Sequence, residues 1–189
     1  MKNLKDYILH LNNWIPNNIS DQTIKELNVQ DQWQKHHWTN SISYNTKSLY
    51  GDKELEVCLI DKLSNKNELQ SLTWKAIERY ILIDKIGDLR GWKGYSNLRF
   101  NKYSQGQSMA RHFDHIHDVF DGQIKGIPIL SIVGVLNDDY EGGEFIMFDD
   151  YEIKFKPGDV IIFPSIFLYP HLVKPIKKGI RYSFVSWVY

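Results

Sequence analysis

Apolar residues recur every three or four positions through much of the first 95 residues, which is the spacing of one face of a helix. The pattern predicts a first helix around residues 4–11 that Pro16 stops, and a second helix over residues 20–29 with Ser20 as its cap. A longer helix is expected over residues 69–83. Its apolar stripe consists of Leu69, Leu72, Ala76, Ile77, Tyr80 and Ile81. The amino-terminal half is therefore predicted to be mainly helical.

From about residue 95 onward, short apolar runs alternate with polar residues and are separated by turn residues, which is typical of β-strands. Two more strands, 38–44 and 55–60, are expected between the helices. The strands predicted after residue 95 span 97–103, 109–114, 129–136, 144–148, 152–155, 160–163, 171–174 and 180–188. So many short strands in roughly 90 residues favour a double-sheet jelly roll over a parallel α/β sheet.

The predicted fold is therefore α+β: a double-stranded β-helix (jelly-roll) core with the amino-terminal helices packed on one face. No Pro/Gly/Ser-rich linker or internal repeat divides the chain, so residues 1–189 are expected to form a single domain. Within it, residues 1–95 would be a helical support layer and residues 96–189 the jelly-roll core that carries the functional site.

Composition narrows the choice of function. Lys plus Arg and Asp plus Glu both number 23, so the net charge is zero, and neither a nucleic-acid partner nor an anionic membrane surface is expected. Cys58 is the only cysteine, which excludes an intrachain disulfide and a cysteine-rich zinc site. No apolar run is long enough for a membrane span or a signal peptide. A soluble cytoplasmic protein is expected.

One group of residues in the strand-rich half could hold a metal ion. His112 and Asp114 are two apart in a predicted strand, so their side chains should share a face, and His171 opens a later strand. Two imidazoles and one carboxylate on one side of a metal leave coordination positions open, which suits non-haem Fe(II) with a chelating co-substrate and O2. Zinc accepts the same donors, so a hydrolytic zinc site is an alternative. The His-x-Asp spacing alone is weak evidence.

A second pair of residues could bind an anion. Arg181 and Ser183 alternate in the last predicted strand and should face the same way. A guanidinium fork binds a carboxylate through two hydrogen bonds, and a hydroxyl adds a third. Close to a ferrous ion, the pair would hold the distal carboxylate of a 2-oxo diacid. An isolated arginine at a strand end is, however, commonly a surface residue.

The motifs after residue 97 occur together in a known order. The run from Tyr103 through Gly106 to His112-Phe113-Asp114 resembles the first metal motif of the prolyl 4-hydroxylase-like 2-oxoglutarate/Fe(II) dioxygenases. Further matches are Glu141-Gly142-Gly143-Glu144, Pro157-Gly158-Asp159, and the closing pattern His171, Val173, Pro175, Gly179 and Arg181, followed by Trp187. The resemblance covers residues 97–189.

The resemblance implies roles for these residues. His112, Asp114 and His171 would be the Fe(II) ligands and the catalytic centre. The co-substrate 2-oxoglutarate would bind Arg181, Tyr103 and Ser183, and Trp187 would pack beside the co-substrate and the entering substrate. With O2 as the second co-substrate, the enzyme would hydroxylate an unactivated C–H bond and release succinate and CO2.

The resemblance also implies a prolyl residue of a peptide or protein as the acceptor. A free amino acid or another small metabolite is the alternative within the enzyme class. A jelly-roll binding module that retains its metal without turnover is the alternative of another class. The polar segment 117–126 is a candidate substrate lid or an ordinary surface loop. The sequence leaves the oligomeric state open.

Overall fold

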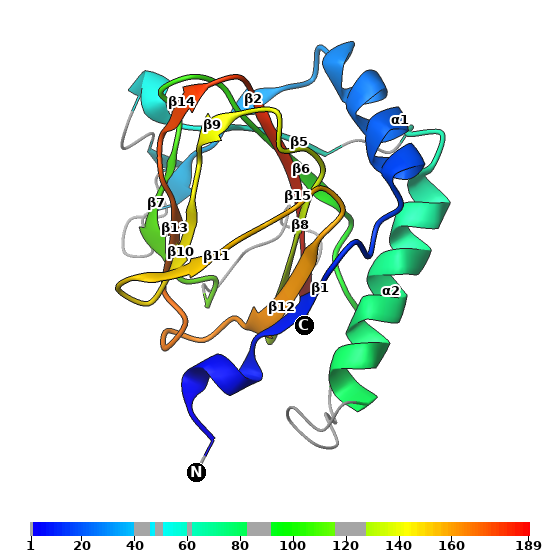
Figure 1. Ribbon diagram of the computed structural model, residues 1–189, viewed down its shortest axis with the longest axis vertical. Coiled ribbons are helices and arrows are strands. Elements are labelled where there is room, and N and C mark those ends of the chain that lie inside the picture. Colours follow the sequence, from blue (N-terminus) through cyan, green and yellow to red (C-terminus); the bar gives the residue numbers. More distant parts are fainter. Residues whose placement is uncertain (1, 40–45, 48–50, 60–61, 83–91, 116–127) are drawn as a thin grey trace.

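The computed structural model describes residues 2–39, 46–47, 51–59, 62–82, 92–115 and 128–189. Two sheets face each other, and two helices run along the outer side of the larger sheet (Figure 1). The α+β jelly roll predicted from the strand pattern is confirmed.

Among the described residues the larger sheet contains seven strands, and each pair of neighbouring strands is antiparallel. Its order is β1 (Leu9–Leu11), β12 (Val160–Pro164), β8 (Leu130–Val135), β15 (Arg181–Val188), β6 (Arg99–Tyr103), β5 (Glu56–Leu59) and β2 (Gln34–Lys35). The facing sheet has the order β11 (Tyr151–Ile153), β10 (Phe145–Met147), β13 (His171–Val173) and β7 (Met109–His112). Two short pairs complete the sheets: β14 (Ile176–Lys178) with β9 (Glu141–Gly142), and β3 (Trp38–Thr39) with β4 (Thr46–Lys47).

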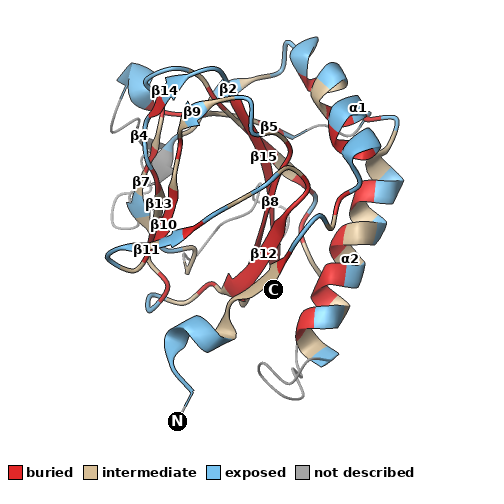
Figure 2. Ribbon diagram, viewed as in Figure 1, coloured by how far each residue is buried: buried red, intermediate tan, exposed pale blue. Residues whose placement is uncertain are grey.

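The central strand β15 separates two apolar clusters because its side chains alternate between the two faces of the sheet. Tyr182, Phe184 and Val188 pack in the cluster that includes the helices. Val185 and Trp187 pack in the cluster between the two sheets. All eight residues of β15 are buried. In Figure 2 the buried residues, drawn in red, follow the strands of this sheet and the sides of the helices that face it.

The two helices of the support layer are α1 (Asn17–Asn28) and α2 (Lys66–Leu82). In α2, the predicted apolar stripe faces the sheet, since Leu69, Ala76, Ile77 and Tyr80 are buried. No helix among the described residues has both the length and the hydropathy needed to cross a membrane. Short 3-10 turns occupy Leu4–Tyr7 (η1) and Gly51–Lys53 (η2).

The prediction of a first helix over residues 4–11 is wrong. Only Leu4–Tyr7 is helical, as a single 3-10 turn, and Leu9–Leu11 forms the edge strand β1 against β12. The leucines at positions 9 and 11 also fit a period of two. Pairing with a strand 150 residues away outweighed the local helical spacing.

The predicted start of the second helix is also wrong. The helix begins at Asn17, and Ser20 is buried inside it rather than capping it. Pro16 stands at the N-cap, where its φ of −57° already suits a helix start. The proline therefore opens this helix instead of stopping the one before it.

The strands predicted after residue 95 all correspond to observed strands, apart from differences at their ends and the short strands β9 and β14, which the pattern missed. Strand β5 lies within the predicted 55–60. Of the predicted strand 38–44, β3 covers Trp38–Thr39 and residues 40–44 lie outside the described residues. The candidate lid 117–126 also lies outside them.

Candidate active site

The three predicted metal ligands lie together between the two sheets. His112 ends β7 and His171 begins β13, and they are register partners with ring centroids 4.2 Å apart. Asp114 Oδ1 lies 3.4 Å from His112 Nε2 and 3.9 Å from His171 Nε2. The three ligand atoms are all within 4.8 Å of one another, so one metal ion could meet all three.

The sequence placed Asp114 on the same strand as His112, and this detail is wrong. Strand β7 ends at His112, and its pairing with β13 is already irregular before that point. Asp114 is held instead by side chains of the larger sheet. Its Oδ2 accepts hydrogen bonds from Ser131 Oγ at 2.6 Å and from Trp187 Nε1 at 3.0 Å. Oδ1 is therefore the oxygen that faces the histidines.

The histidine rings are oriented by backbone carbonyl groups. His112 Nδ1 lies 2.8 Å from the carbonyl oxygen of Ala110, and His171 Nδ1 lies 3.1 Å from that of Tyr169. A carbonyl oxygen only accepts, so in the neutral rings each Nδ1 carries the proton and each Nε2 presents its lone pair. This is the tautomer that a metal ligand requires.

The electrostatics of the group also suit a cation. Burial lowers the pKa of His171 to about 4, and repulsion from His112 adds to the effect, so the His171 ring is neutral near pH 7. Burial raises the pKa of Asp114, but attraction to His171, the contact with His112 and the hydrogen bond from Ser131 outweigh burial and bring the pKa well below its usual range. The result is a neutral donor beside an ionised carboxylate.

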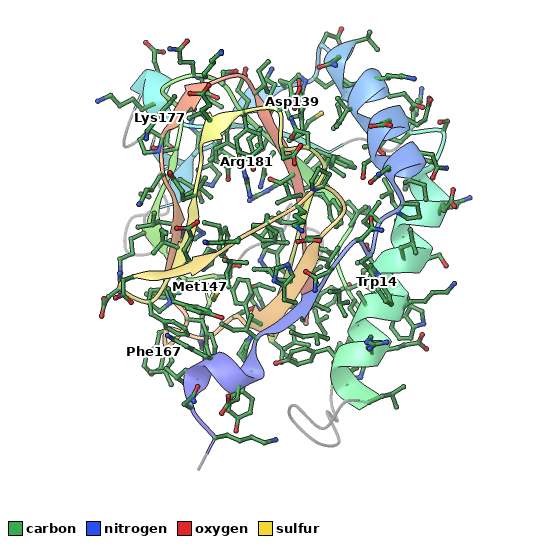
Figure 3. The ribbon with its side chains drawn as sticks, in the orientation of Figure 1. Trp14, Asp139, Met147, Phe167, Lys177 and Arg181 are labelled. Carbon is green, nitrogen blue, oxygen red and sulfur yellow. The ribbon has the colours of Figure 1, made fainter. Side chains whose placement is uncertain are left out.

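Arg181 is the largest of the fully buried side chains that the structure describes. It opens β15 with 1% of its surface exposed and points into the space between the sheets (Figure 3). Nη1 donates to Ser183 Oγ at 3.1 Å, and the guanidinium carbon lies 5.1 Å from the centroid of the Tyr103 ring. Nε and Nη2 are buried, and neither has a hydrogen-bond partner among the residues that the structure describes.

Two unsatisfied donors on one buried guanidinium are costly unless a ligand meets them. Nε and Nη2 form one edge of the guanidinium, which is the edge that binds a carboxylate through two parallel hydrogen bonds. The residues present therefore fit the distal carboxylate of 2-oxoglutarate. Ser183 supports the arginine, and the buried phenol of Tyr103 lies beside it; burial raises the pKa of Tyr103, with Arg181 opposing the rise.

Gly143 explains why the glycine pair of the motif stands next to the site. It has a φ of +68°, and a Cβ there would lie 2.5 Å from Ile176 Cδ1 and 3.3 Å from Arg181 Cδ. A side chain at this position would be strained and would press on the arginine.

Trp187 contacts both the carboxylate of the metal group and an arginine of the cavity. Its indole N–H donates to Asp114, so it positions the carboxylate, while its ring lies against Arg99 with 4.9 Å from the guanidinium carbon to the ring centroid. The prediction that Trp187 packs beside co-substrate and substrate stays a prediction.

Sequence reasoning missed two polar residues of the same cavity. Arg99 and Asn101 alternate with Tyr103 along β6 and line the cavity with the metal-site residues. The cavity has a volume of about 30 Å³. Projecting the alternation of β6 back from Tyr103 would have found both residues.

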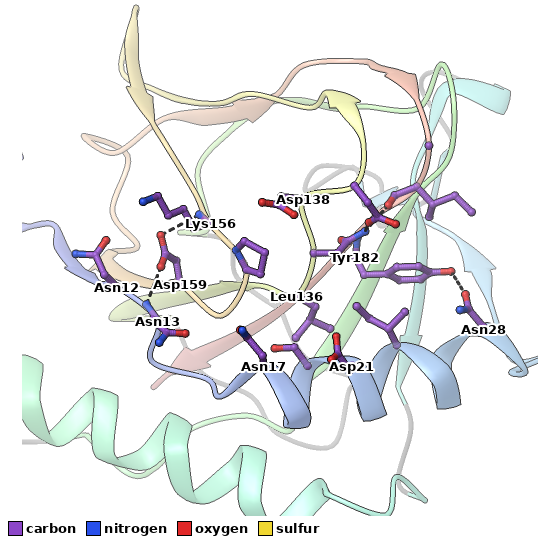
Figure 4. A pocket seen from close by; sticks show the side chains of 17 residues that line it. Asn12, Asn13, Asn17, Asp21, Asn28, Leu136, Asp138, Lys156, Asp159 and Tyr182 are labelled. Carbon is purple, nitrogen blue, oxygen red and sulfur yellow. Dashed lines mark hydrogen bonds between the residues drawn. The ribbon is translucent and has the colours of Figure 1, made fainter.

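A larger groove lies away from this site, between α1 and the loops that flank β12 and β15 (Figure 4). Its lining is mostly asparagine and aspartate, and Asp159 in it is bound by the backbone N–H groups of Asn13 and Lys156. The described residues that line it include neither Arg181 nor any member of the histidine–aspartate group. The chemistry is therefore concentrated in the smaller cavity between the sheets.

A jelly roll in which two histidines and one carboxylate face a buried arginine could hold a metal ion and a carboxylate ligand side by side. Comparison with known proteins agrees with this arrangement. Residues 98–189 match the model of the 2OG-Fe(II) oxygenase superfamily. The resemblance seen in the motifs is thus confirmed over residues 98–189, and members of the matched superfamily use Fe(II), 2-oxoglutarate and O2.

Curated relatives share the same region of the chain. A PKHD-type hydroxylase of Stenotrophomonas maltophilia is 36% identical over 99 residues, which are 50% of this chain and 43% of that protein. A PKHD-type hydroxylase of Xylella fastidiosa is 35% identical over 107 residues, covering 48% of this chain and 43% of the relative. The matches thus span less than half the length of these relatives.

Solved structures resemble the whole fold. The Trichoplax adhaerens prolyl hydroxylase, solved with a peptide fragment of the hypoxia inducible factor oxygen degradation domain, aligns with a TM-score of 0.75 at 17% identity, over 97% of this chain and 84% of that chain. A Pseudomonas putida prolyl-4-hydroxylase aligns with a TM-score of 0.70 at 18% identity, over 96% and 91%. At this level of identity the likeness concerns the fold.

Proposed function

We propose that this protein is a 2-oxoglutarate- and Fe(II)-dependent dioxygenase that hydroxylates a prolyl residue of a peptide or protein. The overall reaction consumes one O2: one oxygen atom enters the C–H bond as hydroxyl, and the other enters succinate as 2-oxoglutarate loses CO2. The observation that carries the proposal is Arg181, whose buried, unpartnered Nε and Nη2 open into the same cavity as His112, Asp114 and His171.

The protein's own residues have separable tasks in this reaction. His112, Asp114 and His171 would hold the iron from one side, and Arg181 with Ser183 would hold the distal carboxylate of 2-oxoglutarate. The bound iron and 2-oxoglutarate supply the oxidation chemistry. The chain contributes positioning and a dry wall, because Phe145, Val133 and other apolar residues of the second cluster exclude water around the site.

The prolyl acceptor rests on relatives and structural neighbours rather than on a contact within the cavity. The names of the two solved neighbours describe prolyl hydroxylases, and one of them was solved with a peptide. The polar lining contributed by Arg99 and Asn101 leaves room for a second candidate, a small acidic metabolite or free amino acid.

The test is succinate formation from 2-oxoglutarate under air with added Fe(II), with and without a proline-rich peptide library. Peptide-stimulated succinate and a product that gains one atom of ¹⁸O from labelled O2 are expected. Asp114→Ala provides the blank, and Asp150→Ala, which removes an exposed carboxylate, provides the matched control.

The other outcomes separate the alternatives. Binding of metal and 2-oxoglutarate without stimulation by any peptide would move the acceptor to small molecules. No binding of 2-oxoglutarate would overturn the dioxygenase and favour a metal-retaining binding module or a hydrolytic zinc site.

A further inference from the structure

Arg99 is a second arginine in the cavity, and the proposed reaction leaves it without a task. It lies on the inward face of β6, where it is the register partner of Val185, and it lines the cavity with the histidine–aspartate group. Its Nε is buried and has no hydrogen-bond partner in the described part of the chain. Burial lowers the pKa of Arg99, with Asp114 and Tyr103 opposing the change, yet an arginine retains its charge at neutral pH.

The surroundings of Arg99 fix its plane but leave its Nε without a partner among the described residues. Trp187 packs against the guanidinium with 4.9 Å between the guanidinium carbon and the ring centroid, which uses the face of the guanidinium and leaves its N–H edge free. Within the described part of the chain, no carboxylate lies within ion-pair distance of Arg99. A pre-oriented arginine without a protein anion is the arrangement of an anion-binding site.

The co-substrate does not account for Arg99. Arg181 is the register partner of Tyr103, whereas Arg99 is the partner of Val185, so the two arginines enter the cavity four positions apart along the paired strands. That separation corresponds to about 13 Å along the strand direction. Arg181 is anchored by Ser183 and Tyr103, whereas Arg99 is anchored by Trp187, the residue that also binds Asp114.

We propose that Arg99 binds a carboxylate of the hydroxylation substrate, so that the acceptor is an acid whose carboxylate lies close to the carbon that is oxidised. This inference rests on the proposed function and narrows its substrate class. The close link from Arg99 through Trp187 to Asp114 places the carboxylate beside the metal group. Asn101, whose Oδ1 is also buried without a partner on the same face, provides an acceptor for a neighbouring N–H of that substrate.

The first experiment measures binding without turnover. The protein is loaded with Zn(II), which replaces iron without supporting oxidation, and saturated with 2-oxoglutarate. Acetate and acetamide, which differ in charge but scarcely in shape, are then titrated and observed by saturation-transfer NMR of their methyl groups. Acetate is expected to bind at least about tenfold more tightly than acetamide, and Arg99→Gln should remove this preference.

The controls separate a carboxylate site from general effects. Lys102→Gln removes a cation from the opposite face of the same strand, where Lys102 pairs with Glu56, and should leave the preference intact. Arg99→Lys keeps the charge without the fork and should retain part of the preference. If Arg99→Gln weakens 2-oxoglutarate binding as much as acetate binding, Arg99 serves the co-substrate and the proposal fails. Equal binding of acetate and acetamide by the unaltered protein would also overturn it.

The second experiment uses pairs of candidate acceptors under air with Fe(II). L-proline and L-prolinamide, N-acetyl-L-proline and its amide, and prolyl peptides with Glu or Gln beside the proline are compared by succinate formation. The acid of the active pair is expected to exceed its amide at least about tenfold in kcat/KM, and Arg99→Gln should abolish the difference. The active pair identifies the source of the carboxylate: a free acid, a chain terminus or a side chain.

Failure of this proposal differs from failure of the proposed function. An amide that equals its acid as an acceptor would refute the role of Arg99 while leaving the hydroxylase in place. An acetate preference that depends on Arg99, with no succinate from any acceptor, would keep the carboxylate site and refute the hydroxylase.

Discussion

The two faces of strand β15 show how one strand serves two different purposes. Tyr182, Phe184 and Val188 face the helical layer and are packed among apolar side chains. Arg181 and Ser183, from the alternate positions, face the cavity with polar atoms. All eight residues of the strand are buried, so burial alone does not distinguish the two faces.

Among the side chains of β15, the difference lies in whether the buried polar groups have hydrogen-bond partners. On the helix-facing side, even the polar group of Tyr182 is satisfied, since its hydroxyl donates to Asn28 Oδ1 at 2.7 Å. On the cavity side, Arg181 Nε and Nη2 are buried without partners among the described residues, as are Arg99 Nε and Asn101 Oδ1 on the neighbouring strand β6. An unsatisfied buried polar group lowers the free energy of unfolding by about 1–3 kcal/mol. The cavity face is therefore less stabilising than it could be, and a bound ligand would satisfy its polar groups. Substitutions on the two faces should therefore affect different measurements.

The largest expected effect is on the cavity side, at a metal ligand. His171→Ala removes one of three ligand atoms within 4.8 Å of one another and should lower succinate formation by about 1000-fold or more. Fe(II) binding, measured by equilibrium dialysis, should be lost as well. His37→Ala, which removes an exposed histidine, is the control. Retention of unaltered metal affinity in His171→Ala would contradict the ligand assignment.

The helix-facing side should respond in stability instead. Phe184 is fully buried and packs edge-on against Phe100, with ring centroids 6.5 Å apart. Phe184→Ala should lower the free energy of unfolding by about 3–5 kcal/mol, because it leaves a cavity between the sheet and the helices. Urea unfolding measures this loss. Metal affinity per folded molecule, measured at low temperature, should stay unchanged, and a parallel loss of metal affinity would show that the two faces are not independent.

Gly134 allows the packing around Phe184 to be tested by adding atoms instead of removing them. It is the register partner of Phe184, and a Cβ there would lie 2.2 Å from the phenylalanine ring. Gly134→Ala should therefore destabilise the fold by about 1–3 kcal/mol through overpacking. Adding Phe184→Leu should recover part of that loss. If the double variant lost more stability than the two single variants together, steric conflict would not be the cause.

Alternation in the sequence was sufficient to predict which side chains of β15 share a face, because a period of two is a local property of extended backbone. The same property predicted that Arg181 and Ser183 act together, and they are hydrogen-bonded. It also located most of the jelly-roll strands. Where local spacing fitted two structures, as for the leucines at positions 9 and 11, the choice was made by pairing with β12, which no local pattern contains.

The supporting contacts of the site could not be predicted for the same reason. The hydrogen bond from Trp187 to Asp114 joins residues 73 positions apart, and it depends on how the two sheets pack. Arg99 received no role because an arginine on a strand is informative only when its surroundings are known. Its missing partner is a property of the folded cavity.

A substitution at Arg181 tests whether its unsatisfied donors bind 2-oxoglutarate. Arg181→Gln removes both Nε and Nη2 and should raise the KM for 2-oxoglutarate by about 100-fold, with a smaller change in kcat. Arg181→Lys keeps the charge without the forked guanidinium, so its KM for 2-oxoglutarate should lie between those of the unaltered protein and Arg181→Gln. Arg79→Gln, on the exposed side of α2, is the control. An unchanged KM in Arg181→Gln would refute the proposed co-substrate contact.

The smallest effect is expected when one indole N–H is removed, which can be done on either side of the sheet at Trp187 or Trp14. Trp187→Phe keeps a ring beside Arg99 but removes the donor to Asp114 Oδ2, so the carboxylate is less firmly held and Fe(II) affinity should fall by about tenfold. Trp14 donates its indole N–H to the Leu72 carbonyl oxygen in the helical layer (Figure 3), so Trp14→Phe should lower thermal stability and leave metal affinity unchanged. If both variants lost stability and neither lost metal affinity, Trp187 would be a packing residue like Trp14. A loss of metal affinity confined to Trp187→Phe would show that this face of the sheet is organised around the ion.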